Sequence, residues 1–150
     1  MNTVKLLNDS RLQPSQKRRL TFWNKNYFAC MMLASLLGTY LDLFFVGKQM
    51  YEFPVRLLPR IFSINIAFTL IGLPVFVMIF IYCISKVNKW GSAGIILFVS
   101  LLMPIFEKFA EVLGFFVHAN QWNHLYTFFG YLLFLTIIAA FYQWLEKQSR

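Results

Sequence analysis

The sequence predicts an all-α integral membrane protein, a four-helix bundle of antiparallel up-down topology. Of its 150 residues, 59% are hydrophobic and only 13% are charged, whereas soluble domains carry about 25% charged residues. A soluble chain of this length would need more polar side chains to cover its surface. The apolar residues fall in four long runs, and most Lys and Arg residues lie outside them. A bilayer therefore suits this chain better than water.

The chain begins with a basic segment, residues 1–26, which holds six Lys or Arg residues. The apolar run that follows, 27–46, is longer than the hydrophobic core of a signal peptide and precedes no small-residue cleavage motif. We therefore expect it to be retained as the first transmembrane helix, and the basic segment to form a cytoplasmic tail.

Three further apolar runs follow, each close to the ~20 residues that a helix needs to cross a bilayer. They are residues 61–84, 94–117 and 125–144. Short, turn-like connections make successive helices antiparallel neighbours. The prediction is a single transmembrane domain, 27–145, with a short cytoplasmic end at 146–150. In an alternative for the third run, the crossing ends near Pro104 and residues 105–117 lie in the outer interface as an amphipathic helix.

The positive-inside rule orients the bundle. The side that holds the six bases of the tail also holds Lys86, Lys89, Lys147 and Arg150. The opposite side holds Lys48, Arg56 and Arg60. This imbalance predicts that both termini are cytoplasmic, and Trp residues near the predicted helix ends agree with the boundaries.

Ionisable side chains within the apolar runs are costly in hydrocarbon, so each suggests a function. At about 100° per residue, Glu107 and Glu111 share one face of the third run, and His118 follows on the same face. Asp42 and Asn65 lie toward the outer ends of the first two runs. The predicted polar site comprises Asp42, Asn65, Glu107, Lys108 and Glu111, with Arg56, Arg60 and His118 as loop contributors.

Three intramembrane carboxylates face one lysine, so at least one acid must be protonated, solvated or bound to a cation. Glu107 and Glu111 would repel each other if both were ionised. The hypothesis is an outward-facing ion, proton or small-ligand site. In the alternative, Lys108 pairs with Asp42 or a glutamate, the polar groups serve only assembly, and the chain is a non-transporting accessory or interaction protein.

An intramembrane enzyme is a third interpretation, but no catalytic motif supports it. The sequence contains neither metal-binding spacings nor a phosphate-binding glycine pattern, so we predict no metal and no cofactor. Cys30 and Cys83 are expected to be buried, reduced thiols. The basic residues form no stripe interleaved with aromatics, which argues against nucleic acid. The expected partners are the lipid bilayer and either a second copy of the chain or another membrane protein, because four short helices enclose little volume.

One loop carries a recognisable sequence, Tyr51-Glu-Phe-Pro-Val-Arg-Leu-Leu-Pro-Arg60, followed by Ile-Phe-Ser-Ile-Asn-Ile. It resembles the signature of a family of small, uncharacterised four-helix membrane proteins of Bacillus-type and clostridial bacteria. Asp42, the spaced acids Glu107 and Glu111, and the segment 121–128 extend the resemblance over residues 27–145. The resemblance implies a multi-pass protein of the bacterial plasma membrane, and it brings no activity, substrate or site residues with it.

Overall fold

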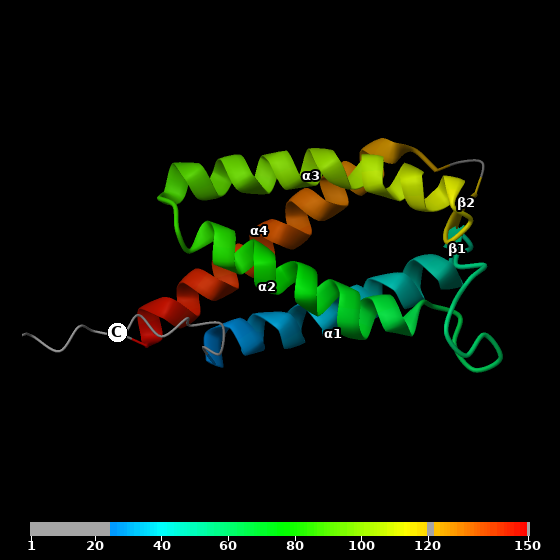
Figure 1. Cartoon of the computed structure of the whole chain (residues 1–150), viewed down its shortest axis with the longest axis horizontal. Coiled ribbons are helices and arrows are strands. Elements are labelled where there is room, and N and C mark those ends of the chain that lie inside the picture. The colour runs from blue at the N-terminus through cyan, green and yellow to red at the C-terminus, as the bar shows by residue number, and fades with distance from the viewer. Residues whose placement is uncertain (1–24, 120–121, 150) are drawn as a thin grey trace, which may run out of the picture.

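The computed structural model describes residues 25–119 and 122–149. Four α-helices dominate it: α1 (Lys25–Gly47), α2 (Leu73–Ile84), α3 (Lys89–Val112) and α4 (His124–Gln148). A π-helical segment, η2 (Phe68–Gly72), leads into α2, and two short strands, β1 (Tyr51–Glu52) and β2 (Val117–His118), form an antiparallel pair. Successive helices run in alternate directions along an elongated bundle, with the strands at one end (Figure 1). The predicted all-α class is confirmed apart from this pair of short strands, whereas nearly all of the predicted tail lies outside the described residues.

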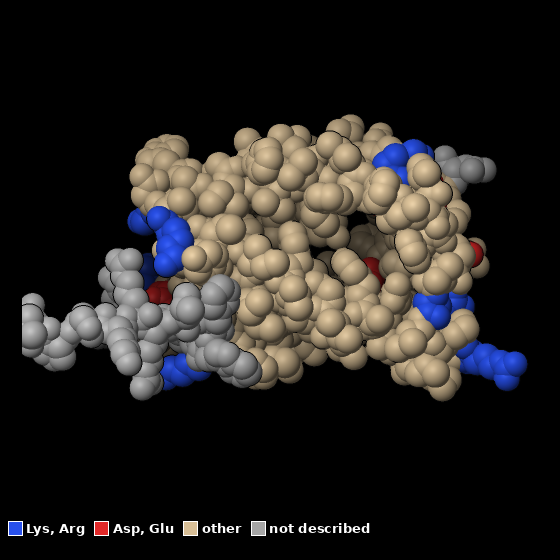
Figure 2. Space-filling model, viewed as in Figure 1, with Lys and Arg blue, Asp and Glu red and all other residues tan. Residues whose placement is uncertain are grey.

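Three of the helices, α1, α3 and α4, are long and apolar enough to cross a membrane. The helical stretch Phe68–Ile84 is apolar but shorter. Large hydrophobic side chains point outward along the bundle; Tyr40, for example, is 68% exposed and Val112 is 76% exposed. On the face shown in Figure 2, Lys and Arg gather at the two ends, and the surface between them carries almost no charge. This distribution is compatible with a membrane protein.

The second helix begins later than the predicted residue 61. Asn65 ends the preceding loop: its backbone carbonyl accepts hydrogen bonds from the amides of Phe68 and Thr69, and its side-chain oxygen lies 3.3 Å from the Phe68 amide nitrogen. Asn at a helix start satisfies amides that have no partner inside the helix. The hydrophobic run concealed this boundary, because Ile61, Phe62 and Ile64 are apolar but lie in the loop.

The third helix spans Lys89–Val112 rather than the predicted 94–117. It starts early because the Asn88 side chain accepts a hydrogen bond of 2.8 Å from the Gly91 amide. It ends early because Gly114 adopts a φ of +77°, a left-handed conformation that suits glycine after a helix. The helix continues through Pro104, so residues 105–112 are part of α3 rather than a separate helix. Helices α1 and α4 extend slightly beyond the predicted spans 27–46 and 125–144.

The π-helical turn links α2 to α1. The Leu73 amide bonds to the carbonyl of Phe68, five residues back, so the same pattern would assign the Thr69 carbonyl to residue 74. Residue 74 is proline and has no N–H to donate. The Ser35 hydroxyl of α1 donates to that carbonyl instead, at 2.8 Å in a buried position. One proline thus exposes the acceptor that joins the two helices.

The apolar core lies mainly between α1, α2 and α4, where Cys30, Ala34, Val77, Leu135 and Ile138 are fully buried. Helix α3 packs chiefly on α4. Helix α2 packs chiefly on α1 and has far fewer contacts with α3. Cys83 is exposed, so the expectation of two buried thiols holds for Cys30 alone.

We expect Gly38→Leu to destabilise the fold by about 1–3 kcal/mol, the usual cost of overpacking a core. A Cβ at Gly38 would lie 2.3 Å from Cδ2 of Leu73, which is itself buried. Thermal unfolding in detergent measures the effect. Gly94→Leu is the matched control, because a Cβ there meets nothing within 4 Å; equal losses for the two variants would contradict close packing of α1 on α2.

Candidate functional site

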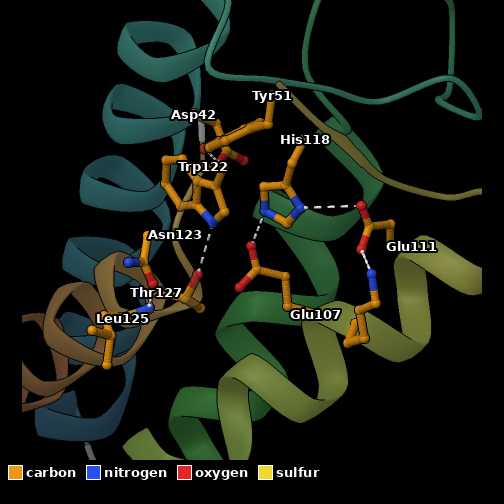
Figure 3. A network of polar contacts seen from close by, with 10 residues as sticks. Asp42, Tyr51, Glu107, Glu111, His118, Trp122, Asn123, Leu125 and Thr127 are labelled. Atoms are coloured by element: carbon orange, nitrogen blue, oxygen red, sulfur yellow. Dashed lines mark hydrogen bonds and ion pairs between the residues drawn. The ribbon is translucent and has the colours of Figure 1, made fainter. Parts of the chain in front are cut away.

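The β1–β2 strand pair lies at one end of the bundle, and β2 carries His118 back over the end of α3. Gly114 reverses the chain after the helix, and β2 then pairs with β1 so that His118 stands opposite Tyr51. The Ala119 amide donates to the Met50 carbonyl at 3.0 Å, which extends the pairing. The His118 side chain points toward α3 (Figure 3).

The His118 imidazole lies between two glutamates of α3. Its Nε2 atom is in direct contact with Oε1 of Glu107, and its Nδ1 atom lies 3.6 Å from Oε1 of Glu111 (Figure 3). Glu107 and Glu111 are one helical turn apart, which places them on the same face. Lys108 completes the series, since its ammonium donates to Oε2 of Glu111 at 2.7 Å.

Burial changes along this series. The side chains of His118 and Glu107 are only 6% and 10% exposed, whereas Glu111 is 24% exposed and Lys108 is 60% exposed. The series therefore runs from a buried carboxylate, through an imidazole, to a carboxylate and an ammonium at the surface.

Two polar atoms in the buried part have no hydrogen-bond partner within the described part of the chain: Oε2 of Glu107 and Nδ1 of His118. Leaving a buried polar atom unpaired costs about 1–3 kcal/mol, and more for a charged group. Such atoms mark positions where a proton, a water molecule or a ligand can be accommodated.

A second acid, Asp42 of α1, faces the same end of the bundle. The Tyr51 hydroxyl donates to its Oδ1 atom at 2.6 Å. Burial, followed by the neighbouring Asp42 carboxylate, raises the pKa of Tyr51 far above its ordinary value, so the phenol remains a neutral donor. Glu107 and Tyr131 also act electrostatically on Tyr51. Asp42 and Glu107 therefore border the same interior region.

Aromatic rings cover the imidazole. Tyr51, Phe53 and Phe116 pack together beside His118, and the Trp122 ring stacks on it with a centroid distance of 5.1 Å and an interplanar angle of 20°. The Trp122 indole N–H donates to Thr127 of α4 at 3.3 Å. The β1–β2 strand pair, α3 and the start of α4 are therefore joined around His118.

We expect Tyr51→Phe to destabilise the β1–β2 strand pair by about 1.5–3 kcal/mol, the typical contribution of a hydrogen bond to a charged group. The ring and its aromatic contacts would remain, but Asp42 would lose its donor. Hydrogen exchange of the β1 and β2 amides and thermal unfolding measure the loss. Tyr40→Phe is the control, since Tyr40 is 68% exposed two residues before Asp42. Unchanged exchange and unfolding in Tyr51→Phe would show that the bond to Asp42 does not stabilise the β1–β2 strand pair.

The structure brings together Glu107, Lys108, Glu111 and His118 in one set of contacts, with Asp42 nearby. It gives the other predicted residues different roles. Asn65 caps a helix. Arg56 braces its own loop through the carbonyls of Phe53 and Phe62, at 2.6 Å and 2.8 Å. Arg60 is exposed on the same loop.

Two residues of the site, Tyr51 and Trp122, are not predicted from the sequence. Tyr51 stands out there only as the first residue of the loop signature, and Trp122 only as an aromatic residue near a helix end and a member of the segment 121–128. No sequence signal specifies that two-residue strands will pair across more than 60 residues, and this pairing is what places both rings at His118.

Among residues 25–119 and 122–149, no group of three or more His, Cys, Asp or Glu side chains has an arrangement that could hold a metal ion. The chemistry that the observed contacts support is transfer of a proton or binding of a cation. Comparison with known proteins finds no matching family model, no matching curated protein and no matching solved structure.

Proposed function

We propose that this chain is a multi-pass protein of the bacterial plasma membrane in which Glu107, His118 and Glu111 form a proton relay. The observation that supports it best is the position of one imidazole between two carboxylates of different burial. Imidazole can accept a proton at one nitrogen while releasing one from the other. A proton taken up at the more exposed Glu111 would thus reach the buried Glu107 through His118.

The proposed orientation places the end with β1 and β2 outside and both termini in the cytoplasm. Among the described residues, each end carries four bases: Lys25, Lys86, Lys89 and Lys147 at the end where α1 begins and α4 ends, and Lys48, Arg56, Arg60 and Lys108 at the end with β1 and β2. The remaining bases, five in residues 1–24 and one at residue 150, all adjoin the termini. The positive-inside rule then favours cytoplasmic termini, and the resemblance of the loop signature supports a bacterial plasma membrane.

The test is proton flux into lipid vesicles that contain the purified protein, driven by a potassium diffusion potential and followed with an internal pH-sensitive dye. The proposal predicts flux above that of protein-free vesicles, and loss of that flux when the relay is interrupted. Flux equal to that of protein-free vesicles would overturn it.

A non-transporting accessory role is the second candidate. It is favoured by the hydrogen bonds that join the elements at the end with β1 and β2, from Tyr51 to Asp42 and from Trp122 to Thr127, because such bonds also serve assembly. This role predicts no flux, together with loss of stability when those bonds are removed.

A further inference from the structure

At the end of the bundle that carries β1 and β2, the interior is open to the side (Figure 2). Figure 2 shows an opening on this face, next to α3, with an acidic side chain visible inside it. Its position agrees with the helix packing, since α2 lies mainly on α1 and α3 mainly on α4. If the helices cross a bilayer, this opening faces lipid rather than water.

Among residues 25–119 and 122–149, the two acids of this interior, Asp42 and Glu107, are not paired with Lys or Arg, and the basic group in contact with Glu107 is the His118 imidazole. Lys108 bonds to Glu111, and Lys48 lies over the Phe44 ring at 5.4 Å from its centroid. The interior thus presents two carboxylates, and Oε2 of Glu107 is buried without a partner. A cation is the ligand that this charge favours.

The rings next to these acids favour an organic cation over a metal ion. Phe45, Tyr51, Phe53 and Phe116 form an aromatic group beside the acids, and aromatic faces attract cations within about 6 Å, more strongly when water is excluded. Metal coordination needs a convergence of ligands that the described residues do not provide. An apolar body combined with a positive charge fits both the lateral entrance and the site.

We propose that the site binds a hydrophobic organic cation, which enters from the bilayer through the lateral opening and pairs with the carboxylates of Glu107 and Asp42. This inference rests on the proposed function, because a cation at Glu107 occupies the position that the relayed proton would otherwise take. Binding releases that proton through His118 and Glu111, and uptake of a proton by Glu107 releases the cation. The negative charge of the Glu107 carboxylate is thus neutralised by the organic cation when it is bound, and by the proton when the cation is released.

Binding of tetraphenylphosphonium to the purified protein in lipid nanodiscs tests the inference by equilibrium dialysis. Tetraphenylborate is the control ligand, since it has nearly the same size and the opposite charge. We expect the phosphonium ion to bind in excess of empty nanodiscs, and the borate ion to show no excess. Equal binding of the two ions, or no excess binding of the phosphonium ion, would overturn the inference.

Glu107→Gln is expected to raise the Kd for tetraphenylphosphonium at least about tenfold, as loss of a desolvated charge pair does. Asp42→Asn should weaken binding in the same direction. Glu52→Gln is the matched control, because Glu52 is exposed on β1 at the same end of the molecule. Wild-type affinity in both Glu107→Gln and Asp42→Asn would contradict binding at these acids.

Proton flux separates failure of this inference from failure of the proposed function. Flux without phosphonium binding would leave the relay intact and remove the organic cation as its ligand. Binding without flux would retain the cation site and remove the relay. Size-exclusion profiles and unfolding temperatures of each variant identify any that fail to fold.

Discussion

Glu107→Gln is expected to reduce proton flux through reconstituted vesicles to the level of protein-free vesicles. Glutamine retains the size of glutamate and can still contact Nε2 of His118, but it does not take up and release a proton at neutral pH. The Glu107 side chain is 10% exposed, against 24% for Glu111, and Glu107 lies at the inner end of the series. No other acid among the contacts of His118 can replace it there.

Two variants control this prediction. Glu52→Gln removes the same charge from an exposed position on β1, so its flux should equal that of the wild type. Glu111→Gln interrupts the outer step, where the side chain is 24% exposed and water can supply protons directly, so its flux should lie between the two. Wild-type flux in Glu107→Gln would refute the relay through this residue.

Much of the helical architecture could be predicted from the sequence because an apolar run of about 20 residues matches the length of a helix that crosses a bilayer. The ends of the helices were predicted less well, since capping decides them. Asn65 starts a helix inside one apolar run, and Gly114 ends a helix inside another. Single residues with special hydrogen bonding or backbone geometry have little weight in a pattern read over twenty positions.

Glu107 and Glu111 lie on one face of α3, as the helical period predicts, but His118 joins them for a different reason. On a continuous helix, His118 would lie about 16 Å along the axis from Glu107, at 1.5 Å per residue. It contacts Glu107 because the chain reverses at Gly114 and returns as β2. That reversal depends on pairing with β1, which lies far away in the sequence and consists of only two residues. Local patterns carry no information about this contact.

His118→Gln is expected to abolish proton flux while leaving the fold almost as stable as the wild type. The glutamine amide can still donate to Glu107, so the buried carboxylate keeps a partner, but an amide cannot accept a proton on one side and release it on the other. This variant separates the chemistry of the imidazole from its contribution to packing.

His118→Phe gives the complementary result. Phenylalanine retains a ring that can stack on Trp122, but it has no polar atom for Glu107. Removing one partner of a buried pair costs about 3–5 kcal/mol, because the remaining charge stays buried without compensation. We therefore expect a large drop in unfolding temperature for His118→Phe and a small one for His118→Gln, with flux lost in both. If His118→Gln retained flux, protons would reach Glu107 by a route that does not use the imidazole. His118 would then serve only to pack the β1–β2 strand pair against α3.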